Sequence, residues 1–154
     1  MPEPRPDTDP PETELEGYVG YNLKRAYMTL QEDFRRTLGD GGLTTRAFSA
    51  LTLTVQFPQI SQSELARTLG IERSGLVSIV DDLERRGYLV RAQVPGDRRV
   101  QALVPTREGI AAQARAAEAV RAHEDRLLAD LSDEDRATLI ELLTRIRHAG
   151  EGGK

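Results

Sequence analysis

The sequence predicts a mainly α-helical fold with one small β-hairpin, and three observations support this prediction. Apolar residues recur every three or four positions along most of the 154-residue chain, as on one face of an amphipathic helix. Ser, Thr and Gly stand at the borders of these stretches, where helix ends favour them. In residues 88–104, strand-forming residues instead flank the turn Pro95-Gly96-Asp97. We therefore expect one domain over residues 15–150, with four helices, a hairpin and two further helices in that order.

The first predicted helix is long and carries a single apolar stripe. Residues 1–14, which precede it, contain five prolines and little that could be buried, so we expect a disordered tail there. The helix should end at the glycine-rich segment Gly39-Asp40-Gly41-Gly42. A second helix should follow Leu43-Thr44 and end at Pro58. The stripe of the first helix consists of Leu15, Val19, Leu23, Ala26, Leu30, Phe34 and Leu38.

Two short helices joined by a tight turn form the next predicted unit. Ser61 and Glu64 have the spacing of a capping box, in which each side chain accepts from the other residue's backbone N–H. The helix that they begin should end at Gly70, and the next one at Gly87. Their apolar faces are Leu65, Ala66 and Leu69, then Leu76, Ile79, Val80 and Leu83. This pair has the length and the glycine turn of a helix-turn-helix.

Two more helices follow the hairpin. Thr106 should cap a long helix, and Ser132 with Asp135 three residues later should cap the last one. The apolar positions are Ile110, Ala114, Ala117, Val120, Leu127 and Leu131 on the first, and Leu139, Leu142, Leu143 and Ile146 on the second.

Charge is unevenly distributed along the chain. The whole sequence carries −4, but residues 85–107 hold six arginines and one aspartate, a local charge of +5 that leaves −9 for the rest. Binding to a polyanion depends on local potential rather than on the total charge. The net negative charge therefore does not exclude double-stranded DNA as a partner, although arginines on a hairpin tip are often only solvated surface.

The second helix of the helix-turn-helix and the hairpin tip are the expected contacts with DNA. One helix fits the major groove, which is about 12 Å wide. The hairpin tip presents Arg98 and Arg99 to the minor groove, whose negative potential attracts arginine. From its spacing, Asp97 should accept N–H groups of Arg99 and hold that side chain extended. On the helix, the expected contacts are Arg73, Ser74, Val77 and Ser78.

Taken together, these motifs resemble those of the MarR family. The matching segments are Leu43-Thr44, Ala47-Phe48 with Leu51, Ser63-Glu64-Leu65-Ala66, Leu83-Glu84-Arg85-Arg86-Gly87-Tyr88-Leu89, and Asp97-Arg98-Arg99 followed by Leu103-Val104-Pro105-Thr106-Arg107-Glu108-Gly109. The resemblance covers about residues 15–148. It implies a winged helix-turn-helix, with dimerisation helices over 15–42 and 106–148 and a DNA-binding lobe over 43–105. It also implies a cytoplasmic bacterial transcription regulator, with Arg99 in the minor groove and steadied by Asp97.

The recognition helix departs from the family in one respect. Positions 78 and 82 are often basic in relatives, but here they are Ser78 and Asp82. Neither Asp81 nor Asp82 can approach a phosphate favourably, so either they accept from a cytosine amino group or they stay clear of the DNA. The departure also leaves open an alternative function, a DNA-independent protein-interaction or anti-repressor module on the same fold.

The apolar faces of the first and last predicted helices indicate a homodimer. A helix over residues 15–38 would be roughly 36 Å long, more than the DNA-binding lobe can cover. Mutual burial about a two-fold axis would cover it together with the last helix, and a two-fold reader expects a pseudo-palindromic operator. The predicted dimer contacts are Leu15, Val19, Leu23, Leu139, Leu142, Leu143 and Ile146.

The resemblance further implies a small aromatic or phenolic effector and therefore a ligand-responsive repressor. Five aromatic residues lie on or near the first two helices: Tyr18, Tyr21, Tyr27, Phe34 and Phe48. Packing is the alternative for each ring, and Tyr18, Tyr21 and Phe48 are the contacts that we expect with such a ligand. Arg25 or Lys24 could pair with a ligand carboxylate.

Enzymatic, metal-binding and membrane functions find little support in the sequence. We find no acid–base or nucleophile constellation, so we expect no catalytic residue and no enzyme. Cysteine is absent, and His123 and His148 stand alone on charged helices, so we expect surface histidines and no metal or cofactor. No apolar run approaches the roughly 18 residues of a membrane span, and the N-terminus does not resemble a secretion signal.

Overall fold

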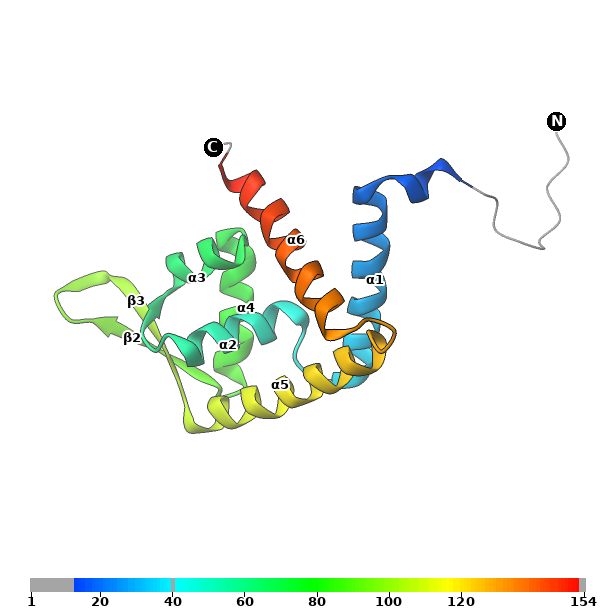
Figure 1. Cartoon of the computed structure of the whole chain (residues 1–154). Helices are drawn as coiled ribbons and strands as arrows, with labels where there is room; N and C mark the ends of the chain where they lie inside the picture. The colour runs from blue at the N-terminus through cyan, green and yellow to red at the C-terminus, as the bar shows by residue number, and fades with distance from the viewer. Residues whose placement is uncertain (1–12, 40, 153–154) are drawn as a thin grey trace, which may run out of the picture.

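A computed structural model describes residues 13–39 and 41–152 of the chain. The expected tail over 1–14 lies mostly outside these residues, but Thr13 caps a short 3-10 helix, η1 (Glu14–Gly17), by accepting from the Leu15 N–H. The elements that follow are α1 (Val19–Leu38), α2 (Thr45–Gln56), β1 (Ile60–Ser61), α3 (Gln62–Leu69), α4 (Arg73–Arg85), β2 (Leu89–Val94), β3 (Asp97–Pro105), α5 (Arg107–Leu127) and α6 (Asp133–Glu151) (Figure 1). The chain is thus mainly helical with a small antiparallel sheet, as the sequence predicts.

The helix ends follow the capping chemistry expected from the sequence. Ser61 and Ser132 each form a complete capping box, with Glu64 and Asp135 respectively. Hydrogen bonds from the backbone and hydroxyl of Ser61 lower the pKa of Glu64, and those from Ser132 lower the pKa of Asp135. Gly70 closes α3 in the left-handed region with a φ of 62°, a conformation that a residue without a Cβ adopts at little cost.

One hydrophobic core joins α2, α3, α4, α5 and the sheet. Leucines from four of these elements are essentially inaccessible to solvent, and burial of each contributes about 1.5–3 kcal/mol to the free energy of unfolding. They are Leu51, Leu65, Leu76, Leu83, Leu89 and Leu103. The expected inner faces of the two helices of the helix-turn-helix are therefore confirmed at Leu65, Leu76, Val80 and Leu83.

The sheet has three strands, one more than the sequence predicts. The order is β1-β3-β2, all antiparallel, and β1 pairs Ile60 with Leu103 and Ser61 with Ala102. Two residues are too few to show the alternation that identifies a strand. The β2–β3 hairpin, which we call the wing (residues 89–105), has an irregularity in pairing at Gln93/Val94, just before its tip.

A close contact joins the base of the wing to the start of α5. The Thr106 hydroxyl donates to the Gly87 carbonyl at 2.6 Å, and its N–H donates to the Tyr88 carbonyl at 3.0 Å. The backbone of Gly109 lies so close that a Cβ there would sit 1.8 Å from the Tyr88 oxygen. The glycine three positions after Thr106 is therefore needed for a close approach of two backbones.

The terminal helices leave much of their apolar surface uncovered within one chain. Phe34 is the single buried residue of α1 among those described, and α6 buries none. In Figure 1, α1 and α6 rise from the same side of the molecule, away from the wing. Of the predicted dimer contacts, Leu23 is half-buried, and the rest are at least 38% exposed: Leu15, Val19, Leu139, Leu142, Leu143 and Ile146.

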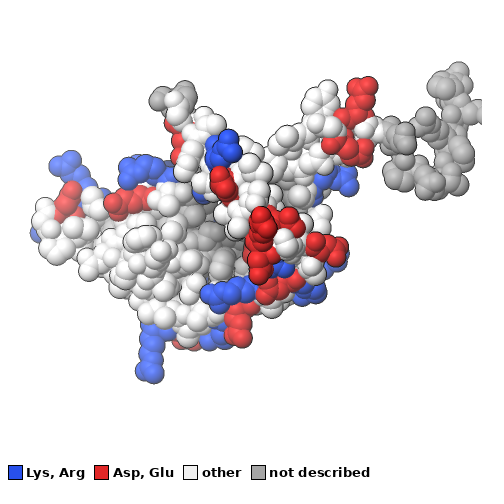
Figure 2. All heavy atoms as spheres, viewed as in Figure 1, with Lys and Arg blue, Asp and Glu red and all other residues white. Residues whose placement is uncertain are grey.

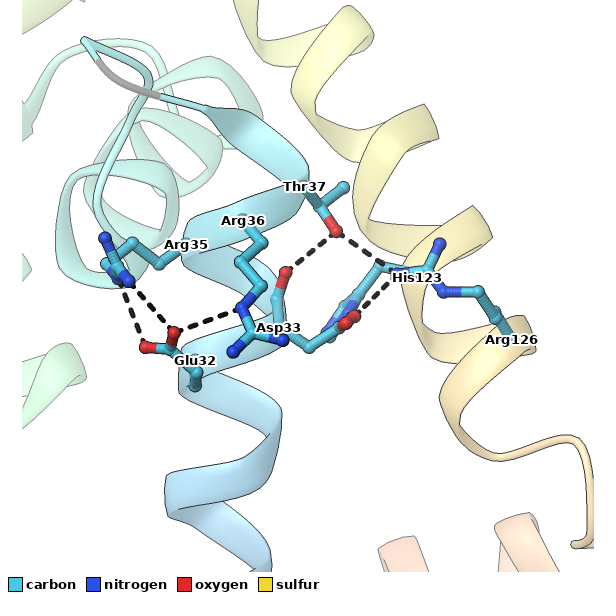
Figure 3. Close-up of polar contacts among 7 residues, drawn as sticks. All are labelled: Glu32, Asp33, Arg35, Arg36, Thr37, His123 and Arg126. Atoms are coloured by element: carbon cyan, nitrogen blue, oxygen red, sulfur yellow. Dashed lines mark hydrogen bonds and ion pairs between the residues drawn. The ribbon is translucent and has the colours of Figure 1, made fainter.

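The buried face of α5 differs from the expected one, and the prediction for His123 is wrong. Ala112, Ala116 and His123 face inward, whereas Ile110 is 48% exposed. His123 is 2% exposed because α1 packs against α5, and its ring stands edge-on to that of Phe34, with 6.1 Å between the ring centroids. Its Nδ1 bonds Asp33 Oδ2 (Figure 3). His148 is exposed, as expected.

Within the described part of the chain, no helix is both long and apolar enough to cross a membrane.

Candidate nucleic-acid interface

The outer face of α4 is open to solvent. Arg73, Ser74, Val77 and Ser78 are all exposed, and the apolar residues behind them are buried in the core. Glu72, the N-cap residue, makes no side-chain cap bond to this helix, so the first N–H groups of α4 lack a side-chain acceptor at that cap position. Nη2 of Arg73 lies 3.4 Å from the Ser63 hydroxyl, which places the start of α4 beside α3. The four predicted contacts therefore share one free surface.

The two aspartates of α4 are engaged by arginines of this same chain. Asp82 is paired with Arg85 and, at 2.8 Å, with Nε of Arg86. Partial burial raises the pKa of Asp82, but the hydrogen bonds and charges of Arg86 and Arg85 outweigh it and hold the pKa below its usual 3.8. This arrangement favours the expectation that Asp82 stays clear of DNA.

Arg91, on the first strand of the wing, pairs with Asp81 and Glu84 of α4. Its Nε also donates to Oε1 of Gln62 at 3.2 Å, and its side chain is 20% exposed. The hydrogen bond that Arg91 donates to Asp81 and the charges of both carboxylates outweigh burial and raise the pKa of Arg91 further above its usual value. The base of the wing is therefore fixed beside the outer face of α4.

From the sequence, Arg91 is expected only as one arginine of the basic segment 85–107. A signal for its role does exist, because Asp81 and Glu84 are three residues apart and so share one side of the helix. Which residue pairs with these two carboxylates depends on how the wing packs against α4, and no short sequence pattern records that packing.

The tip of the wing presents its arginines to solvent. Arg98 and Arg99 are exposed, and Figure 2 shows basic side chains at the end of the molecule formed by the wing. Acidic side chains gather instead where α5 gives way to α6. Asp97 Oδ1 accepts from the backbone N–H of Arg99 at 3.0 Å. Asp97 therefore orders the turn through the main chain of Arg99, and its contact with the Arg99 guanidinium is not formed in this structure.

A cavity of about 510 Å³ lies between the second half of α1 and the start of α2. Two aromatic residues, two arginines and three glycines line it together with neutral polar and aliphatic residues: Tyr27, Gln31, Phe34, Arg35, Gly39, Gly41, Gly42, Leu43, Thr44, Thr45 and Arg46. Such a lining suits an aromatic ligand that carries negative charge.

None of the four predicted ligand contacts lines this cavity. Phe48 lies behind its wall, 6.0 Å from the Phe34 ring. Tyr18 is 62% exposed, and Arg25 lies over the Tyr21 ring at 5.9 Å. Arg25 also lines a separate surface hollow with Met28 and Leu127 among others. The expected contacts are aromatic or basic residues near the first two helices, whereas the residues that line the cavity depend on how α1 and α2 cross.

Comparison with known proteins agrees with this arrangement. Residues 41–100 match the family model described as the MarR family. The chain is 36% identical over 133 residues to a protein of Thauera aromatica described as a putative transcriptional regulatory protein for the hcr operon. The matched residues make up 86% of this chain and 80% of that protein.

Two solved structures of the transcriptional repressor CouR have the same fold. The one bound to a 23-mer DNA duplex is 40% identical, with a TM-score of 0.86 over 91% of this chain and 99% of that one. The one bound to p-coumaroyl-CoA is 39% identical, with a TM-score of 0.79 over 87% of this chain and 94% of that one. An exposed helix beside a basic wing, the family match and these relatives lead to one conclusion: the chain belongs to the MarR family of winged helix-turn-helix transcriptional regulators.

Proposed function

We propose that this protein is a ligand-responsive transcriptional repressor that binds a pseudo-palindromic DNA operator as a homodimer. α4, the recognition helix, enters the major groove through Arg73, Ser74, Val77 and Ser78. Arg98 and Arg99 of the wing reach the adjacent minor groove.

The observation that carries the DNA-binding part is the attachment of the wing beside the recognition helix. Arg91 ties β2 to Asp81 and Glu84, so the wing is held next to the surface that the helix presents. One subunit can then contact a major groove and a neighbouring minor groove together. The relative at 40% identity that is bound to a DNA duplex supports the same assignment.

The homodimer rests on the apolar surfaces of the terminal helices. α1 and α6 leave large apolar side chains exposed, and burial of such surface drives association. Because a two-fold pair presents two recognition helices, it requires two half-sites about one helical turn apart.

The ligand response rests on the cavity beside the start of α2. Tyr27 and Phe34 provide aromatic surface, and Arg46 provides positive charge. A relative of 39% identity binds p-coumaroyl-CoA, an aromatic acyl thioester with several negative charges, and compounds of this class fit such a lining.

The test is to enrich genomic fragments on the purified protein and to measure binding of the recovered duplex by fluorescence anisotropy over a range of salt concentrations. We expect affinity to fall steeply with salt, with a log–log slope of about −0.9 for each phosphate neutralised. A scrambled duplex of equal length is the control and should bind far more weakly. Absence of salt-dependent, sequence-selective binding would contradict the proposal and favour the DNA-independent interaction module.

A further inference from the structure

Arg86 spans two parts of the molecule that are far apart in sequence. Its Nε donates to Asp82 Oδ2 at 2.8 Å, and its Nη1 donates to the Gly41 carbonyl at 2.7 Å. Asp82 belongs to the last turns of the recognition helix, and Arg86 is that helix's C-cap residue. Gly41 lies 45 positions earlier, in the loop between α1 and α2.

The loop that Arg86 reaches forms a wall of the 510 Å³ cavity. Gly39, Gly41 and Gly42 all line this cavity. Gly39 and Gly41 have φ values of 70° and 78°, which favour glycine, so the loop's path depends on them. Gly41 and Gly42 of the same loop also line a smaller hollow of about 190 Å³, and Arg86 is among the residues that line this second hollow. One side chain thus connects the cavity wall with the recognition helix.

Arg85 provides a natural comparison within the same turn of helix. It also pairs with Asp82, but its side chain is 77% exposed, and among the described residues it bonds nothing else. Arg86 is 29% exposed and bonds both Asp82 and the loop. The two arginines therefore share a charge and an acidic partner, and they differ in the contact with Gly41.

We propose that Arg86 is a positioning residue that couples the cavity wall to the recognition helix, so that displacement of the loop at Gly41 alters the placement of α4. This inference rests on the proposed function, because it assigns to Arg86 the path by which an occupied cavity changes DNA binding. The planar guanidinium suits this role, since its separate N–H groups can hold a carboxylate and a carbonyl at fixed angles. Both bonds are near 2.8 Å, so a loop shift of about 1 Å breaks the one to Gly41.

The experiment displaces the loop at Gly41 without a ligand and observes the recognition helix without DNA. A Cβ at Gly41 meets nothing within 4 Å, but the φ of 78° makes Gly41→Ala strained, so the loop must adjust. Gly96→Ala is the matched control, because Gly96 is equally open and has a positive φ of 90°, but it lies at the tip of the wing and outside the loop that Arg86 contacts. The measurement is hydrogen–deuterium exchange of amides in residues 76–86 of the full chain.

The expected result is a non-additive pattern. Gly41→Ala should speed exchange in residues 76–86 by about 2- to 10-fold, the effect of one lost hydrogen bond. It should do so equally in an Arg85→Met background, and it should add nothing in an Arg86→Met background. Gly96→Ala should leave exchange in this segment unchanged. Additive effects of Gly41→Ala and Arg86→Met, or an equal effect of Gly96→Ala, would overturn the proposal.

Arg86→Lys guards against a folding defect in Arg86→Met. Lysine keeps the charge but cannot hold both acceptors in the guanidinium geometry, so Gly41→Ala should again add little in this background. Binding to the enriched duplex is measured separately, and Arg86→Met should weaken it more than Arg85→Met. A wild type that does not bind DNA would contradict the proposed function, whereas the exchange pattern by itself decides the coupling.

Discussion

Arg91 of the wing and Asp81 of α4 form an ion pair that joins the two elements proposed to contact DNA. Glu84 joins the same guanidinium, so one half-buried arginine holds two carboxylates of α4. These two acids, which would be unfavourable next to phosphate, are thereby the attachment points of the wing. The charge that would repel phosphate is balanced within the protein.

Loss of this attachment should weaken DNA binding. In Arg91→Met, Asp81 and Glu84 lose their partner and the wing loses its anchor, so we expect affinity for the enriched duplex to fall by about tenfold, or about 1.4 kcal/mol. Adding Asp81→Asn should recover part of the loss, because it removes one unbalanced charge. Arg121→Met, an exposed charge loss on α5, is the control. Anisotropy titrations measure all four proteins, and equal affinity of Arg91→Met and wild type would contradict the role of this pair.

The wing tip supplies the second prediction. Arg99→Ala should cost about 1–3 kcal/mol in operator affinity and reduce the salt slope by roughly one. Asp97→Ala should have a smaller effect of the same sign, since Asp97 orders the Arg99 backbone at the turn. A gel shift at two salt concentrations checks both variants. Unchanged binding by Arg99→Ala would remove the wing from the mechanism.

The third prediction concerns the exposed apolar face of α6. Leu142 is 46% exposed in one chain and should be covered in the homodimer. Leu142→Asp would place an unpaired charge in that interface, so we expect monomers at concentrations where the wild type is dimeric. Leu142→Met, which keeps the side chain apolar and of similar size, should remain dimeric. Sedimentation velocity distinguishes these outcomes, and a monomeric wild type would rule out the homodimer.

The fourth prediction concerns the close backbone contact at Gly109. A Cβ there would meet the Tyr88 carbonyl oxygen at 1.8 Å, and both partners are main chain, so neither can rotate away. Gly109→Ala should therefore lower the free energy of unfolding by about 1–3 kcal/mol or more. Gly150→Ala, in a helix with open space around its Cβ, should be neutral or stabilising by up to about 1 kcal/mol. Thermal unfolding followed by circular dichroism compares the two.

The fifth prediction concerns the polar cluster between α1 and α5, which consists of Asp33, His123 and Arg126. The hydrogen bond from His123 and the Arg126 guanidinium at 2.7 Å outweigh desolvation and hold the pKa of Asp33 below its usual 3.8 (Figure 3). A carboxyl whose pKa is lowered on folding stabilises the protein above its unfolded-state pKa, and this contribution disappears as the pH falls through the folded-state value.

Asp33→Asn should accordingly melt at a lower temperature than the wild type near neutral pH. The gap should close as the pH falls below about 4, because Asp33 of the wild type then becomes protonated as well. Asp130→Asn, at an exposed position after α5, should follow the wild-type curve throughout. A gap that stays constant down to about pH 3 would contradict the assignment.

Most helix ends and the free side of α4 can be predicted from the amino-acid sequence alone. The caps at Ser61, Thr106 and Ser132 and the turn at Gly70 are confirmed, since each depends on groups within four residues of a helix end. The predicted buried face of α4 is confirmed as well. It could be predicted because the 3.6-residue period of apolar residues is visible in the sequence of one helix alone.

The contacts between side chains that are distant in sequence depend on how the elements pack. The strand Ile60–Ser61 is recognisable only from its pairing with β3. His123 is buried because α1 lies against it, and its partner Asp33 is 90 positions away. The lining of the cavity and the reach of Arg86 to Gly41 depend in the same way on how α1, α2 and α4 are placed. Local patterns report hydrogen bonds and periodicities within a few residues, whereas these contacts arise from the packing of elements whose separation no short pattern records.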